Sequence, residues 1–160
     1  MLPRVFAILK DDSGVASLVG TRIYRHGAAP QKVQAPYVTW FVVSGNPENE
    51  LTSTPRVDRF EIQVDCWSDN DGSGDAGVET LAEAVRTAME PHGHLTRYAV
   101  NERDFDTQRY RIGMEFTLYV HRESVPAPVL ALALSGDSDG GAVLLSGDQA
   151  DDSIDRELVS

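Results

Sequence analysis

The chain has 160 residues with 25 acidic and 14 basic side chains, so its formal net charge is −11. This excess argues against general nucleic-acid binding, which needs clustered Lys and Arg to replace the counterions of the phosphates. No apolar run approaches the ~20 residues that span a bilayer, and the start of the chain lacks the features of a signal peptide. We therefore expect no membrane partner. The single cysteine, Cys66, cannot form an internal disulfide, which favours a reducing cytoplasm.

Hydrophobic periodicity and turn residues predict two helices and four strands. The helices are expected at residues 3–10 and 78–89, and the main strands at residues 37–44, 57–67, 97–105 and 109–122. A short helical turn, which Asp12 or Ser13 caps and Gly20 ends, follows the first helix, and residues 22–24 form a brief strand. Residues 45–47, Gly-Asn-Pro, have the composition of a turn.

The segment from Arg59 to Met89 carries the clearest pattern in the chain. Its strand alternates apolar and polar side chains, which places one apolar series in the core: Phe60, Ile62, Val64 and Cys66. Trp67 then points outward. The helix repeats apolar residues at helical spacing, and Ser73 or Asp75 in the preceding loop is expected to cap it.

The order of these elements is α-β-β-α-β-β, and short links between neighbouring strands imply antiparallel hairpins. We expect an α+β domain over residues 1–123, with an antiparallel four-stranded sheet and two helices on one face. Residues 124–160 form an acidic, low-complexity extension with a weak repeat: Leu134-Ser135-Gly136-Asp137 recurs as Leu145-Ser146-Gly147-Asp148. Within this extension, residues 129–134 and 142–145 are expected to pair as a hairpin that needs a partner surface.

Three motifs suggest chemistry, and each fails in context. Residues 136–140 match G-x-S-x-G, but no histidine follows position 121 and no helical pattern follows the serine. Residues 69–75 resemble a calcium loop, but Thr80 stands where the bidentate glutamate is required. A metal set of His92, His94, Cys66 and His121 lacks a second closely spaced ligand pair. We therefore expect no catalytic residues, no metal and no cofactor, and a small hydrolase or metal-dependent enzyme is the weakest alternative.

A family resemblance extends over residues 1–123, about three quarters of the chain. Its pieces, in order, are Leu18-Val19-Gly20 before Arg22-Ile23-Tyr24, Ala35-Pro36-Tyr37-Val38 opening a strand that closes at Ser44-Gly45, the strand Phe60–Trp67, the helical segment Leu81–Arg86, and Tyr110-Arg111-Ile112 leading to Phe116–Val120. In order and spacing, these pieces resemble the tail-completion (tail terminator) proteins of long-tailed bacteriophages and related prophage particles. The resemblance ends at residue 123, because typical members stop soon after the last strand.

The resemblance implies a structural virion protein that is made in the host bacterial cytoplasm and has no enzymatic activity. Such a subunit assembles as a ring, commonly a hexamer, which caps the tail tube and joins it to the head–tail connector or head-completion protein. DNA would pass through the lumen without specific binding. The alternative within this class is another neck or head-completion protein of a phage or phage-like particle, including a gene transfer agent.

The expected subunit interface combines outward aromatic side chains with the apolar residues of the extension, because aromatic residues are enriched at interfaces. The residues assigned to it are Trp67, Tyr119, Val129, Leu130, Leu132, Leu134, Val143 and Leu145. We expect residues 129–145 to pack on an adjacent ring component by strand addition.

Overall fold

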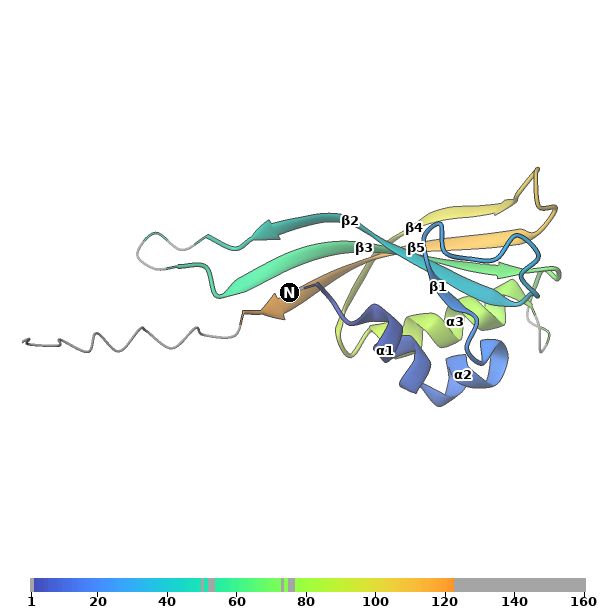
Figure 1. Ribbon diagram of the computed structural model, residues 1–160, viewed down its shortest axis with the longest axis horizontal. Helices are drawn as coiled ribbons and strands as arrows, with labels where there is room; N and C mark the ends of the chain where they lie inside the picture. The colour runs from blue at the N-terminus through green and yellow to red at the C-terminus, as the bar shows by residue number, and fades with distance from the viewer. Residues whose placement is uncertain (1, 50, 52–53, 73, 75–76, 123–160) are drawn as a thin grey trace, which may run out of the picture. The chain divides into compact units, whose positions relative to one another are not determined.

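The computed structural model describes residues 2–49, 51, 54–72, 74 and 77–122. Its elements, in chain order, are α1 (Val5–Asp11), α2 (Ser13–Val19), β1 (Ile23–Arg25), β2 (Tyr37–Pro47), β3 (Val57–Ser68), α3 (Val78–Met89), β4 (Gly93–Arg103) and β5 (Tyr110–His121). The three helices lie together on one face of the sheet (Figure 1). The predicted α+β class is confirmed, whereas the predicted domain boundary at residue 123 and the whole extension lie outside the described residues.

The sheet differs from the predicted one in strand number and in direction. It has five strands in the order β1-β2-β3-β5-β4. β1 runs parallel to β2, and the other neighbours are antiparallel. The predicted four-stranded antiparallel sheet was wrong because the brief strand after α2 joins it, with Ile23 opposite Val38. A three-residue strand leaves too short a pattern to reveal its partner.

The N-terminal helical segment is two helices, so the structure has three helices in place of the predicted two. Asp12 has an extended backbone between them, and its Oδ1 accepts a hydrogen bond from the Val15 amide at 2.9 Å. This is the N-cap arrangement that the sequence predicts for the second helical turn. Gly20 ends α2 with a φ of 56°, as expected. The first helix begins at Val5 rather than at Pro3.

β2 is longer than predicted, because residues 45–47 do not form a turn. Gly45, Asn46 and Pro47 continue the strand and pair with residues 60, 59 and 58 of β3. β4 is also shifted: it spans residues 93–103 rather than 97–105. A tight turn follows, in which the Thr107 amide donates to the Asp104 carboxylate at 2.7 Å.

Backbone carbonyls bind amides at the N-terminus of α3, whereas the predicted capping residues Ser73 and Asp75 lie outside the described residues. The cap residue is Gly77, and within the described residues no side chain caps the helix there. The Val78 amide donates to the carbonyl of Asn70 at 3.0 Å, and the Glu79 amide donates to the carbonyl of Gly72 at 3.1 Å. A Cβ at Gly77 would collide with the Gly72 carbonyl, so this cap requires glycine.

The core lies between the helices and the inner face of the sheet. The predicted inward series of β3 is confirmed, since Ile62, Val64 and Cys66 are fully buried and Phe60 is 9% exposed. The helices cover them with α1, α2 and α3 residues that are also fully or almost fully buried: Val5, Leu9, Val15, Val19, Leu81, Val85 and Met89. Within the described residues, no helix has both the length and the apolar character that crossing a membrane requires.

Candidate functional site

The outer face of the sheet, opposite the helices, is polar and strongly paired. Asp65 of β3 is only 1% exposed. Its Oδ1 accepts a hydrogen bond from Gln63 Nε2 at 2.8 Å, and its Oδ2 accepts one from Arg111 Nη2 at 3.1 Å. A buried carboxylate requires such partners, because desolvation of an unpaired charge is costly. This cluster therefore stabilises the centre of the outer face.

Gly113 of β5 makes room for the Asp65 carboxylate. A Cβ at this position would lie 2.6 Å from Asp65 Oδ1 and 3.2 Å from the Cβ of Val100. We expect Gly113→Ala to lower the free energy of unfolding by about 1–3 kcal/mol, since the carboxylate must move away from its partners. Urea unfolding measures the change. Gly74→Ala is the control, because no atom lies within 4 Å of its added Cβ; equal losses in the two variants would contradict the prediction.

Charged side chains farther along the outer face also find partners within the subunit. Arg97 of β4 donates two hydrogen bonds to Glu115 of β5, from Nε and Nη2, each at 2.8 Å. These bonds hold the pKa of Glu115 below its ordinary value. Thr117 Oγ1 donates to Glu61 Oε2 at 2.9 Å and lies 3.1 Å from Thr96 Oγ1. Most charged groups of the outer face therefore already have partners within the subunit.

Trp67 lies on this outer face, as predicted, and much of its ring is used within the subunit. It stacks on Tyr37 of β2, with ring centroids 5.8 Å apart and planes 2° from parallel. Its Nε1 donates to Thr39 Oγ1 at 3.0 Å, and the Arg111 guanidinium lies 5.1 Å from the ring centroid. These contacts explain the position of Trp67 without a partner, so its role in a subunit interface stays a prediction.

Arg109, at the start of β5, connects three segments beside this aromatic pair. Its Nε donates to Asp69 Oδ1 at 2.9 Å, and its Nη2 donates to the carbonyl of Val33 at 2.8 Å. Its guanidinium also lies 5.3 Å from the ring centroid of Tyr37. One side chain thereby joins the loop before β2 and the loop before α3 to the sheet.

Tyr119, the other aromatic residue predicted at an interface, is 46% exposed. It pairs with Arg59, whereas Trp67 pairs with Arg111, so about 27 Å of β5 separates the two positions at the usual strand rise. The structure does not bring Trp67 and Tyr119 together. The other six predicted interface residues, Val129, Leu130, Leu132, Leu134, Val143 and Leu145, lie outside the described residues.

The end of the sheet near Tyr119 forms an arm, which we define as residues 45–47, 57–60 and 118–121. The arm extends beyond the helices (Figure 1). β1 pairs only with residues 38–40 of β2, and β4 pairs only as far as Leu118 of β5. Within the described residues, both edges of the arm therefore lack a neighbouring strand, apart from Leu118, which pairs with Gly93. Sequence reasoning missed this surface because it assigned residues 45–47 to a turn.

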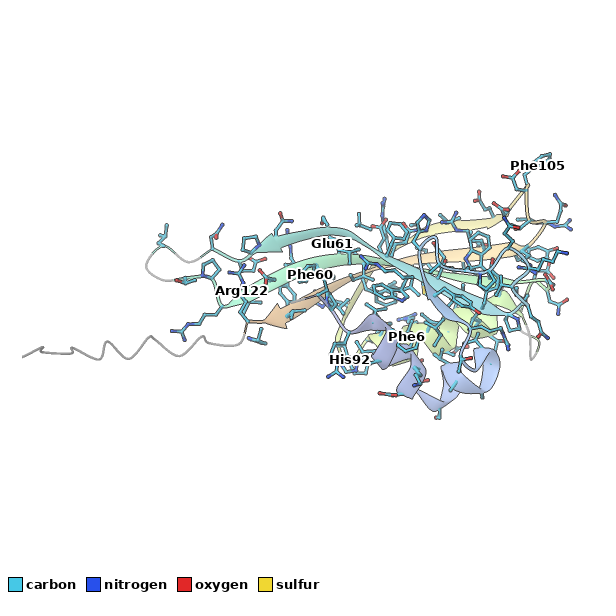
Figure 2. All side chains as sticks on the ribbon, viewed as in Figure 1. Phe6, Phe60, Glu61, His92, Phe105 and Arg122 are labelled. Atoms are coloured by element: carbon cyan, nitrogen blue, oxygen red, sulfur yellow. The ribbon has the colours of Figure 1, made fainter. Side chains whose placement is uncertain are left out.

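An ion pair stabilises the arm. Arg122 donates to both oxygens of Asp58, at 2.9 and 2.6 Å (its position is marked in Figure 2). The hydrogen bonds from Arg122 lower the pKa of Asp58 below its ordinary value of 3.8. Arg59 lies nearby, with its Nε 3.6 Å from Glu48 and 3.9 Å from Glu61. The arm thus holds its charges in pairs, while its strand edges have no partner strand in the part of the chain that the structure describes.

The lowered pKa of Asp58 predicts acid sensitivity. The folded state binds the Asp58 proton less tightly than the unfolded chain, so the ion pair stabilises the fold above pH 3.8 and loses its effect as pH falls toward the lower folded-state pKa. We expect Asp58→Asn to flatten the loss of thermal stability between about pH 5 and about pH 3. Asp106→Asn is the control at an exposed turn. Identical pH profiles for wild type and Asp58→Asn would contradict this expectation.

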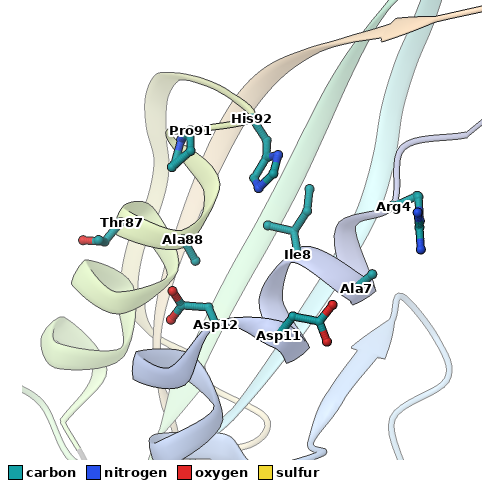
Figure 3. Close-up of a pocket in the computed structure, with 9 residues that line it drawn as sticks. All are labelled: Arg4, Ala7, Ile8, Asp11, Asp12, Thr87, Ala88, Pro91 and His92. Carbon is teal, nitrogen blue, oxygen red and sulfur yellow. The ribbon is translucent and has the colours of Figure 1, made fainter.

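A groove of about 640 Å³ separates α1 and the start of α2 from the end of α3 (Figure 3). Asp11, Asp12, His92 and Arg4 are its charged or titratable lining residues. The Asp12 carboxylate already caps α2. The lining residues include no Ser or Cys, so the groove lacks the Ser–His or Cys–His pair that is usual in acyl transfer; Thr87 carries its one hydroxyl.

The metal set considered from the sequence is not brought together. Cys66 faces the core, where burial raises the pKa of its thiol and keeps it protonated. His94 lies in β4 beside Tyr119, and His92 lines the groove between the helices. The described residues contain no group of three or more His, Cys, Asp or Glu side chains that could hold a metal ion.

Comparisons with known proteins place the chain in a family of virion proteins. The chain matches the family described as tail completion protein gp17 over residues 3–121. A comparison with curated protein sequences gave no match. Among solved structures, it resembles a chain of the virion of a native gene transfer agent particle, with 19% identity, a TM-score of 0.55, and coverage of 74% of this chain and 92% of that one. The protein therefore belongs to the phage tail-completion family, whose members are structural components of the virion and not enzymes.

Proposed function

We propose that this chain is a tail terminator, which assembles as a hexameric ring, caps the tail tube and joins it to the head connector. The observation that carries the proposal is the arm, whose two strand edges have no partner strand among residues 2–122 as far as these are described, in a member of the tail-completion family. Exposed edges are a liability for a protein that works alone, because they offer backbone groups to any passing strand. In an assembly, the same edges bind neighbours by strand addition.

The polar outer face agrees with this role. Its charged groups are already paired within the subunit, through Asp65 with Arg111 and Glu115 with Arg97. A face of this kind does not drive uncontrolled association, so contacts concentrate at the edges and at the arm. The net charge of −11 also suits a lumen through which DNA moves without adhering. Neutralising the acidic residues of a mapped lumen should then slow DNA passage. Unchanged kinetics of DNA ejection would contradict this role of the negative charge.

The decisive experiment measures the native mass of the purified protein, alone and with its tail tube protein, together with electron microscopy of the tubes. We expect a hexamer, at least in the presence of tubes, and tubes of limited length with the protein at one end. Tube protein alone is the control and should give tubes of uncontrolled length. A protein that stays monomeric while tubes grow unchecked would overturn the proposal.

We also propose that residues 129–145 pack on an adjacent ring component by strand addition. The full chain carrying Leu132→Asp and Leu134→Asp tests this, since a charged pair would disfavour an apolar contact. Loss of connector or tube binding with an unchanged unfolding transition is the expected result. Wild-type binding by this variant would exclude the contact.

A further inference from the structure

The β1 edge of the sheet and the surface of α3 beside β4 carry opposite charge, although β4 itself contains Arg97 and Arg103. Residues 13–47 contain no acidic residue, in a chain with 25 acids, and they form α2, the β1 edge and β2. Arg25 at the end of β1 and Lys32 in the following loop are exposed, and neither forms an ion pair within the described residues. We call Arg25 and Lys32 the basic edge.

The opposite side of the subunit presents carboxylates. A groove of about 290 Å³ between α3 and β4 is lined by Glu79, Glu83, Arg86 and Tyr98, together with Ala82 and Ile112. Arg86 is engaged by Glu90, with Nε and Oε1 2.7 Å apart. Glu79 and Glu83 are exposed and, in the described part of the chain, have no cationic partner. We call this surface the acidic groove.

Two carboxylates of the acidic groove repel each other in an isolated subunit. Glu79 and Glu83 stand four residues apart on α3, where like charges destabilise a helix. Tyr98 is 55% exposed and offers an aromatic ring beside them. A cationic side chain from outside would relieve the repulsion between the two carboxylates, and an arginine would also gain from the ring.

Resting on the ring proposed above, we infer that the acidic groove of each subunit binds the basic edge of the next copy. β1 and β4 are the two outermost strands of one sheet, so the complementary surfaces lie at opposite edges of the subunit. An interface between two different surfaces of the same chain is head-to-tail, and it closes into a ring when the rotation between copies allows. Opposite charge on the acidic groove and the basic edge also fixes the orientation of neighbouring copies and disfavours like-with-like contacts.

Two charge-reversed variants test the inference, Glu79→Lys with Glu83→Lys and Arg25→Glu with Lys32→Glu. Each alone should raise the concentration for half-maximal ring assembly by at least about tenfold, because each creates a repulsive contact in every interface. An equimolar mixture should restore rings, since the unaltered basic edge of the first variant meets the unaltered groove of the second, and the two reversed surfaces also match. Native mass should then show equal numbers of the two variants in each ring.

The control for the Glu79→Lys, Glu83→Lys variant is Asp11→Lys with Asp106→Lys, which raises the net charge by the same amount at exposed sites away from both surfaces; it should assemble like wild type. If either variant fails to fold, carbodiimide coupling of Lys32 to Glu83 in the wild-type ring provides the second readout. Wild-type assembly by both variants, no recovery in the mixture, or no Lys32–Glu83 product overturns the inference while leaving the ring intact. A wild-type protein that never forms a ring refutes the proposed function itself.

Discussion

Replacing Phe116 by alanine should lower the free energy of unfolding by about 3–5 kcal/mol, a large part of the stability of an ordinary domain. Phe116 is fully buried at the centre of β5, opposite Ile62 of β3 and Leu95 of β4. Its removal leaves a cavity between the sheet and the helices that the surrounding strands are too firmly paired to close. Urea unfolding followed by circular dichroism measures the loss.

Phe105→Ala is the matched control for this substitution. Phe105 lies in the turn between β4 and β5 and is 87% exposed, and Figure 2 shows it at the tip of the molecule remote from Arg122. The same deletion of a benzyl group should therefore change the free energy of unfolding by no more than about 0.5 kcal/mol. Similar unfolding midpoints for the two variants would contradict the assignment of Phe116 to the core.

Arg111→Ala should be the most damaging substitution on the outer face, with a cost of about 3 kcal/mol. Asp65 is only 1% exposed, so the substitution leaves a buried carboxylate without its cation. Gln63 is then the remaining side-chain donor to Asp65. It also removes the guanidinium from the Trp67 ring. Thermal and urea unfolding should both report the loss.

Two comparisons separate this explanation from a general effect of losing an arginine. Arg97→Ala should cost much less, because the Arg97 side chain is 66% exposed and solvent screens its charge. Asp65→Ala combined with Arg111→Ala should be less destabilised than Arg111→Ala alone, since no buried charge is then left unpaired. A double variant that is less stable to unfolding than Arg111→Ala would show that the unpaired Asp65 charge is not the origin of the destabilisation.

The elements that could be predicted from the sequence are those long enough to repeat their pattern. β3 alternates over 12 residues, and α3 buries Val78, Leu81, Val85 and Met89 on one side. Each pattern states both the element type and the buried face. Because side chains alternate strictly along a strand, the inward position of Cys66 also fixed the outward position of Trp67.

The parts that could not be predicted depend on contacts between distant residues. Nothing within the three residues of β1 specifies a parallel neighbour, because the pairing of Ile23 with Val38 depends on how the chain crosses back after α2. Residues 45–47 have turn composition, yet pairing with β3 overrides it. The bonds from the Val78 and Glu79 amides to main-chain carbonyls could not be predicted either, because carbonyls leave no side-chain signal.

The candidate surfaces show the same division. Alternation placed Trp67 and Tyr119 on the outer face, but their separation along β5 and the ring of Tyr37 over Trp67 required the three-dimensional structure. The basic edge could be suspected from the acid-free run of residues 13–47. Its relation to Glu79 and Glu83 depends on the order of strands in the sheet, which no local pattern encodes.

The three contacts of Arg109 have a consequence for local opening. Its partners Val33 and Asp69 are 76 and 40 residues away in the chain, in two different loops. Neither loop can detach from β5 without breaking a charge-assisted bond to the same side chain, so the two loops should open together as one cooperative unit. Amide hydrogen exchange would then show a shared opening free energy for both loops, and Arg109→Ala would split it into two independent values. A force applied to the loop of Val33 would be transmitted to the loop of Asp69 through the guanidinium of Arg109.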